Sequence, residues 1–112
     1  MEIIKNEDNG VVILELKGRM DAVTSPEAEK ALRELFDGGA SKLLIDLKTL
    51  EYISSAGLRV LLVAAKTIQQ KSGKLALASL TEVVKEVFEI SGFSSIFKLF
   101  PNRDDALKYL KG

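Results

Sequence analysis

The stretch Ile53-Ser54-Ser55-Ala56-Gly57-Leu58 is the most informative part of this chain, because it joins a segment typical of a strand to one typical of a helix. The strand-like run 43–47 precedes it, and a long, mainly apolar run, 58–68, follows it. The first backbone N–H groups of a helix have no partner within the helix, so they stabilise anions such as phosphate. We therefore interpret this stretch as the beginning of a helix that carries a hydroxyl group suited to phosphorylation.

Either serine could cap this helix. If Ser54 is the N-cap, Ile53 and Leu58 have the spacing of a hydrophobic staple, and Ser55 keeps a free hydroxyl at the first helical position. If Ser55 is the N-cap, the staple positions fall on Ser54 and Arg59, which cannot make an apolar contact. We predict that Ser54 is the cap and Ser55 the phosphorylation site, with Ser54 as the second candidate. Many serine N-caps serve stability alone, so the motif by itself does not establish regulation.

The composition predicts one compact domain over residues 1–112. Of these residues, 46% are hydrophobic, and 16 basic residues balance 16 acidic ones, so no charge surplus indicates a nucleic-acid partner. Cysteine and histidine are absent, which excludes disulfides, thiolate metal sites and a Ser-His-Asp triad. The N-terminus does not resemble a signal peptide, and the longest apolar stretch, 60–65, is too short to span a bilayer. We expect a cytoplasmic protein.

Strands and helices alternate along the chain. Strands are expected at 2–6, 11–17, 42–47, 74–79 and 96–100, with a hairpin turn at Asn9-Gly10 and a loop at 19–21. Helices are expected after N-caps at Ser25 or Thr24, Ser54, Thr81 and Asn102. This order predicts an α/β fold with a mixed, mostly parallel sheet of about five strands and about four helices. The N-terminal edge strand should be antiparallel.

Two segments are expected to be buried deeply. The strand at 42–47 has few polar positions, so it should lie centrally and be covered on both faces. The helix at 55–71 is apolar nearly all round, so only Arg59, Lys66, Thr67 and 69–70 should face water. The following helix carries Val83, Val84, Val87 and Phe88 and is expected to end near Gly92.

Three acidic residues near strand ends offer an alternative reading as a metal-binding domain or small enzyme. Glu15, Asp21 and Asp46 could bind a divalent ion at the carboxyl edge of a parallel sheet. We favour a loop turn for Asp21 and a cap at the sheet edge for Asp46, because a metal site needs more convergent oxygens than this arrangement supplies. No cofactor and no metal site are expected. Asp21 follows the second strand, where it could approach the Ser55 turn.

Three segments of the chain resemble the STAS family, which includes the bacterial anti-sigma factor antagonists and domains of sulfate transporters. Residues 47–58 resemble the family pattern of a strand, a short loop and Asp-Ser-x-Gly-Leu. Residues 18–21 resemble its Gly-x-x-Asp, and 90–93 resemble its Ser-Gly-Leu/Phe turn. The resemblance covers almost the whole chain. Ser54 stands where the family often has Asp, and Arg59 where it usually has a small residue.

The resemblance implies an anti-sigma factor antagonist that is not an enzyme. Unmodified protein would sequester a kinase-type anti-sigma factor and free a sigma factor. The kinase would phosphorylate Ser55, and a serine phosphatase would reset the switch. The partner-binding residues would be Asp21, Thr24, Ser54, Ser55, Gly57, Leu58 and Arg59. No nucleic-acid binding or membrane insertion is expected, and the protein would be a monomer or weak dimer. A transport-complex subunit that needs no phosphorylation is the alternative.

Overall fold

An antiparallel hairpin begins the computed structural model, which describes residues 1–112. Strand β1 (Glu2–Asp8) pairs with β2 (Val11–Met20) along its whole length, from Glu2 opposite Lys17 to Asp8 opposite Val11. Asn9 and Gly10 both have positive φ, 49° and 85°, as a type I′ turn requires. The hairpin predicted from Asn9-Gly10 is confirmed, and both strands are longer than expected.

The other strands extend the sheet in parallel from β2. Its order is β1-β2-β3-β5-β6, with β3 (Lys42–Asp46), β5 (Lys74–Ala78) and β6 (Leu99–Phe100). The predicted mixed, mostly parallel sheet with an antiparallel N-terminal edge strand is therefore confirmed. Leu43 to Asp46 are all buried, as the prediction of a central strand required.

A sixth strand, β4 (Leu50–Ile53), was not predicted. It pairs in parallel with the last residues of β2, beyond a register shift between Gly18 and Arg19. Gly18 has φ +96°, and its N–H donates to the carbonyl of Thr49 at 3.1 Å. The chain therefore turns away from β3 at Gly18 and forms a new pairing with β4. The loop expected at 19–21 is therefore wrong for residues 19 and 20, because β2 continues to Met20.

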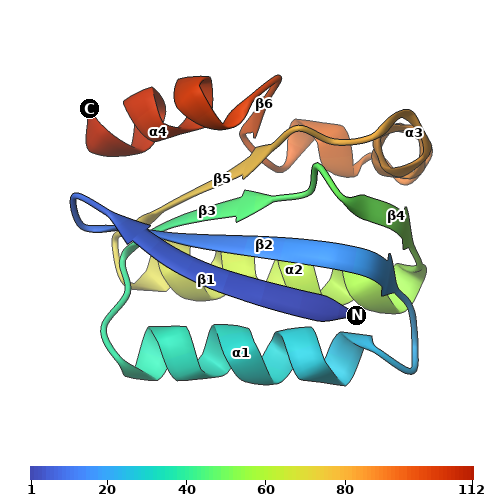
Figure 1. Cartoon of the computed structure of the whole chain (residues 1–112), viewed down its shortest axis with the longest axis horizontal. Helices are drawn as coiled ribbons and strands as arrows, with labels where there is room; N and C mark the ends of the chain where they lie inside the picture. The colour runs from blue at the N-terminus through green and yellow to red at the C-terminus, as the bar shows by residue number, and fades with distance from the viewer.

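The helices cover both faces of the sheet (Figure 1). Helices α1 (Ser25–Asp37) and α2 (Ser55–Gln70) lie on one face, and α4 (Arg103–Lys111) lies on the other. Helix α3 (Glu82–Ile90) packs beside β4, and the 3-10 turn η1 (Phe93–Ser95) follows it. None of these helices combines the length and apolar character needed to cross a bilayer.

The N-caps of three helices agree with prediction, whereas α1 begins one residue earlier than the first of its two expected caps required. Ser54, Thr81 and Asn102 each accept a hydrogen bond from a backbone N–H three residues on. Thr24 occupies the N-cap position of α1, but its side chain makes no capping bond. Ser25 is already helical, so the cap expected first at Ser25 is wrong, and the alternative at Thr24 has the right position.

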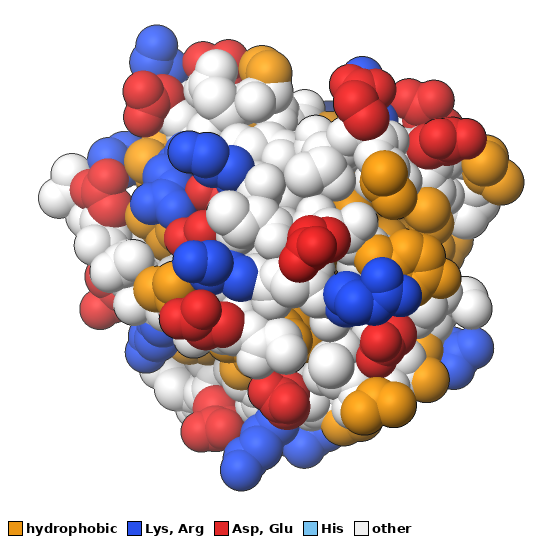
Figure 2. Space-filling model, turned by 45° about the vertical axis from the view of Figure 1, so that its right-hand side comes forward, with side chains coloured by type: hydrophobic (Ala, Val, Ile, Leu, Met, Phe, Trp, Pro, Cys, Tyr) orange, Lys and Arg blue, Asp and Glu red, His pale blue; other side chains and the backbone are white.

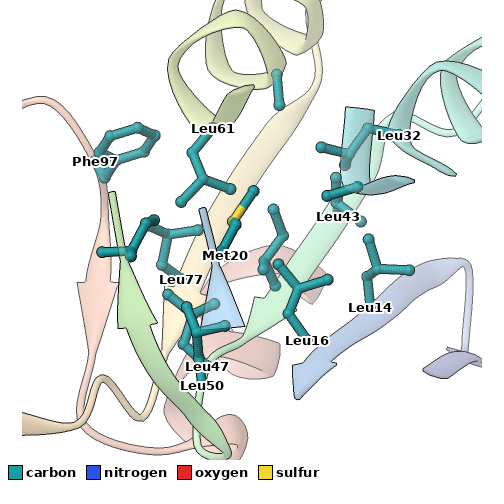
Figure 3. Packing of buried hydrophobic residues seen from close by; sticks show 14 of the residues in the cluster. Leu14, Leu16, Met20, Leu32, Leu43, Leu47, Leu50, Leu61, Leu77 and Phe97 are labelled. Carbon is teal, nitrogen blue, oxygen red and sulfur yellow. The ribbon is translucent and has the colours of Figure 1, made fainter. Parts of the chain in front are cut away.

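Alternation along β2 divides the core into two layers. Val12, Leu14 and Leu16 belong to the larger apolar cluster, which α1, α2 and α3 cover. Val11 and Ile13 point the other way, into a smaller cluster closed by α4. Figure 3 shows side chains from the sheet and from the helices meeting in the larger cluster. Met20, at the end of β2, is fully buried there, so the end of this strand is anchored in the core.

Two further predictions need correction. Helix α2 is not buried all round: Val63 is 49% exposed, because the sheet and α1 cover only part of its surface. The strand expected at 96–100 is limited to β6. Phe97 instead packs its ring against Phe88, at 5.6 Å between centroids.

Candidate functional site

The site is built where β2, β4 and α2 meet. Ser54 follows β4, and its N–H donates to the carbonyl of Met20 at 2.9 Å. Its extended backbone (φ −96°, ψ 175°) directs the side-chain oxygen back to the helix, where it accepts from the Gly57 N–H at 3.4 Å. The prediction that Ser54 caps α2 is confirmed. Ile53 and Leu58, the predicted staple pair, both belong to the larger apolar cluster.

Ser55 is the first residue of α2, and its side chain is exposed. Its hydroxyl makes no hydrogen bond, because Ser54 has taken the capping role. The backbone N–H groups of Ser55 and Ala56 also have no acceptor within the protein, as expected for the first turn of a helix. An anion attached to Ser55 would therefore meet unpaired donors and the positive end of the helix dipole.

Gly57 is buried and lets α2 approach the end of β2 closely. A Cβ atom at this position would lie 2.7 Å from Cγ1 of Ile53. It would also lie 2.9 Å from Cγ of Met20 and 3.0 Å from the Met20 carbonyl oxygen. Real Cβ contacts are not this short, so the motif needs glycine for packing, a reason that the sequence pattern did not reveal. Leu58 is also buried, so residues 57 and 58 pack against the core beneath the serine turn.

Asp21 organises the loop between β2 and α1. Its Oδ1 accepts from the backbone N–H groups of Val23 at 3.0 Å and Thr24 at 3.1 Å. The Thr24 N–H is the largest cause that lowers the pKa of Asp21 below its ordinary value, with the Val23 N–H and the Arg19 charge acting in the same direction. The Thr24 hydroxyl accepts from the Asp21 N–H at 2.9 Å and donates to the Arg19 carbonyl at 2.7 Å. The loop is therefore held firmly beside the Ser54 turn.

Arg19 and Tyr52 form a second exposed feature that sequence reasoning missed. They are register partners in the β2–β4 pairing, and the Arg19 guanidinium lies 4.5 Å from the centre of the Tyr52 ring. Arg19 Nε also lies 3.9 Å from Oδ2 of Asp21. No local sequence pattern indicates this pair, because the two residues are far apart in the sequence. They meet only through the pairing of β2 with β4, a strand that was not predicted.

A shallow apolar groove adjoins the site between α1 and α2. Near the helix N-termini its lining includes Ala22, Ala56, Arg59 and Val63, and it continues along both helices past Phe36. Val23, at the edge of the site, is 85% exposed. In Figure 2, which brings the β4 end of the molecule forward, hydrophobic side chains gather on one side between scattered charged ones. Such a surface is typical of protein–protein contact, where apolar patches adjoin charged rims.

The acidic residues considered for a metal site are not grouped together. Asp46 is buried, and its Oδ2 accepts from the Arg103 guanidinium at 2.8 and 3.0 Å. Glu15 lies 3.8 Å from the same guanidinium, whereas Asp21 belongs to the loop described above. No three acidic residues come together in a way that could hold a metal ion. Oδ1 of Asp46 accepts from the Lys48 N–H, so the predicted cap at the sheet edge is confirmed.

Comparison with known proteins agrees with this architecture. The family model described as STAS domain matches residues 2–106. BtrV of Bordetella bronchiseptica is 40% identical over 111 residues, which cover 99% of this chain and 96% of that protein. The anti-sigma-F factor antagonist RsfB of Mycobacterium tuberculosis is 30% identical over 106 residues, covering 95% and 86%.

A solved structure, that of the Bacillus cell fate determinant SpoIIAA in its phosphorylated form, superimposes with a TM-score of 0.75. Its sequence identity is 15%, and the match covers 96% of this chain and 98% of that one. This likeness concerns the fold alone. Together with the family model and the relatives, it leads to one conclusion: the chain belongs to the STAS domain family.

Proposed function

We propose that this protein is an anti-sigma factor antagonist whose binding is switched off by phosphorylation of Ser55. The observation that carries the proposal is the exposed hydroxyl of Ser55 at the first position of α2, left free because Ser54 caps the helix. The relative RsfB, 30% identical, bears the name of an anti-sigma factor antagonist. The chain would act as a docking module and kinase substrate, not as an enzyme.

The partner would be a serine kinase that also acts as the anti-sigma factor. Unmodified protein would bind this kinase and thereby free the sigma factor. In the modification step, the Ser55 oxygen attacks the γ-phosphorus of ATP, its proton passes to a base of the kinase, and ADP leaves. A serine phosphatase would hydrolyse the phosphoester and restore binding. The added charge, about −1.5 to −2 at neutral pH, would repel a surface shaped for a neutral hydroxyl.

The docking surface would surround Ser55. The exposed or half-exposed members of the predicted set are Asp21, Thr24, Ser54, Ser55 and Arg59. Gly57 and Leu58 are buried, so we assign them a supporting role in place of direct contact. Arg19, Tyr52 and Val23 add a stacked cation, an aromatic ring and an apolar contact to the same end of the molecule.

Phosphate mapping tests this proposal. The protein is incubated with its cognate anti-sigma factor kinase and ATP, and the modified residue is located by mass spectrometry. We expect labelling of wild type and of Ser54→Ala, and none of Ser55→Ala. Labelling of Ser55→Ala to the wild-type extent, or a phosphate located on Ser54, would show that the assignment is wrong. Circular dichroism of both variants confirms that each substrate is folded.

A further inference from the structure

Arg59 is an exposed cation one helical turn beyond Ser55, and it makes no ion pair in the protein. Residues four apart on a helix have Cβ atoms about 5–6 Å apart, and the long Arg side chain can lean toward the preceding turn. Residues 55 and 59 both lie on the outer side of α2, away from its buried positions at 57, 58, 61 and 64. An Arg at this position can therefore reach a group attached to Ser55.

We propose that the phosphoryl group on Ser55 is bound within the same chain by the guanidinium of Arg59. This inference rests on the proposed function, since it concerns the phosphorylated state of Ser55. The unpaired N–H groups of Ser55 and Ala56 lie beside the same group and add two neutral donors. A planar guanidinium can donate two parallel hydrogen bonds to phosphate oxygens, and this bidentate geometry makes Arg a strong phosphate ligand.

Two acidic residues and the other arginine near this point already have partners. Glu29, the acidic residue that lines the groove together with Arg59, lies 3.4 Å from the Arg33 guanidinium. Asp21 is held by two backbone N–H groups and faces Arg19. Arg19, the other arginine at this end of the molecule, is stacked on Tyr52. Arg59 is therefore the arginine of the site that is free to receive the phosphate.

The arrangement has a consequence for the switch. In the unmodified protein, Arg59 is available to an acidic group of the partner kinase. Once Ser55 is phosphorylated, the guanidinium turns to the phosphate of its own helix. Phosphorylation thus adds negative charge to the docking surface and withdraws a positive one at the same time.

Phosphorus NMR on protein that carries phosphoserine at position 55 tests this binding directly. The phosphoserine is placed during protein synthesis, so the sample does not depend on any kinase. A nearby cation favours the dianion, so the second pKa of the phosphate should be lower in wild type than in Arg59→Gln, by about 0.5 unit. Arg59→Lys keeps the positive charge, so its phosphate should titrate closer to that of wild type than to that of Arg59→Gln.

The matched control is Lys66→Gln, which removes an exposed cation from the same helix about two turns further on. It should leave the phosphate titration unchanged. Equal titration of wild type and Arg59→Gln would overturn the proposal, and so would a shift in Lys66→Gln as large as that in Arg59→Gln. Arg59→Lys titrating like Arg59→Gln would also contradict it. A kinase that fails to label Ser55 would instead count against the proposed function, and would leave this titration unaffected.

Discussion

The N–H of Ser54 donates to the carbonyl of Met20 at 2.9 Å, and this bond joins the end of β2 to the beginning of α2. Met20 is fully buried, so the bond ties the exposed serine turn to the centre of the core. The Asp21 loop begins at the next residue, which places both parts of the proposed docking surface on one rigid support. Substitutions that disturb this junction should therefore affect stability and binding together, whereas a change at Ser55 alone should affect only binding.

Gly57→Ala should destabilise the protein, although Ala normally favours a helix over Gly by about 1 kcal/mol. The new Cβ would overlap Cγ1 of Ile53 and press on Met20, at 2.7 and 2.9 Å. Overpacking of this kind typically costs about 1–3 kcal/mol. Urea denaturation measures the loss, and Ser55→Ala in the same turn is the control for general effects of alanine. A Gly57→Ala protein as stable as wild type would show that the close approach is not required.

The two serines should differ in their effect on stability. Ser54→Ala removes the cap of α2, and because its bond to the Gly57 N–H is long, 3.4 Å, we expect a loss near the lower end of the range for caps, about 0.5–1 kcal/mol. Ser55→Ala removes an exposed hydroxyl without a partner, so the free energy of unfolding should change by less than about 0.5 kcal/mol. Denaturant titration of the two variants side by side decides the matter. The reverse order of stabilities would mean that Ser55 is the cap.

The Asp21 carboxylate should make the free energy of unfolding depend on pH in the acidic range. The folded state lowers its pKa, chiefly through the Thr24 N–H, so its contribution is fully present above the unfolded pKa of about 3.9. It is lost as the pH falls through the lower folded pKa. Asp21→Asn keeps an oxygen that can accept the same N–H bonds at every pH. We expect the stability advantage of wild type over Asp21→Asn to be largest near neutral pH and to shrink below about pH 4.

Denaturation at a series of pH values measures this advantage. Asp37→Asn, at the end of α1, is the control for the loss of one surface charge. An advantage of wild type over Asp21→Asn that grew as the pH fell would contradict the role of these hydrogen bonds.

Arg103 should stabilise the fold through Asp46. Arg103→Met would leave the Asp46 carboxylate buried without its partner at 2.8 Å. Breaking a fully buried pair costs about 3–5 kcal/mol, but the Arg103 side chain is 37% exposed, so we expect about 2 kcal/mol. In an Asp46→Asn background the same substitution should cost clearly less. A double-mutant cycle measures the difference, and equal costs in both backgrounds would show that the two residues are not coupled.

Much of the fold followed from local sequence signals. The Asn9-Gly10 turn and the caps at Ser54, Thr81 and Asn102 were predictable, because each depends on residues within four positions. Strand β4 was not, because it is short and exists only through pairing with the end of β2. The exposure of Val63 also escaped prediction, because an apolar periodicity cannot tell which sides of a helix the other layers will cover.

The candidate site could be predicted in part for the same reason. The serine turn is local, so its cap and its exposed hydroxyl were visible in the sequence. The contacts that hold it in place are not local: the Ser54 N–H bonds to Met20 at the end of β2, and Arg19 of β2 stacks on Tyr52 of β4. The reason for glycine at position 57 likewise became visible only when β2 and α2 were placed against each other.

One phosphoryl group on Ser55 is expected to change binding without changing the fold. Isothermal titration calorimetry of the cognate kinase with unmodified protein, and with protein carrying phosphoserine at position 55, tests it most directly. We predict at least a tenfold loss of affinity, about 1.4 kcal/mol, with an unchanged far-ultraviolet circular dichroism spectrum. Equal affinity of the two forms, or a loss that accompanies unfolding of the modified protein, would contradict the account.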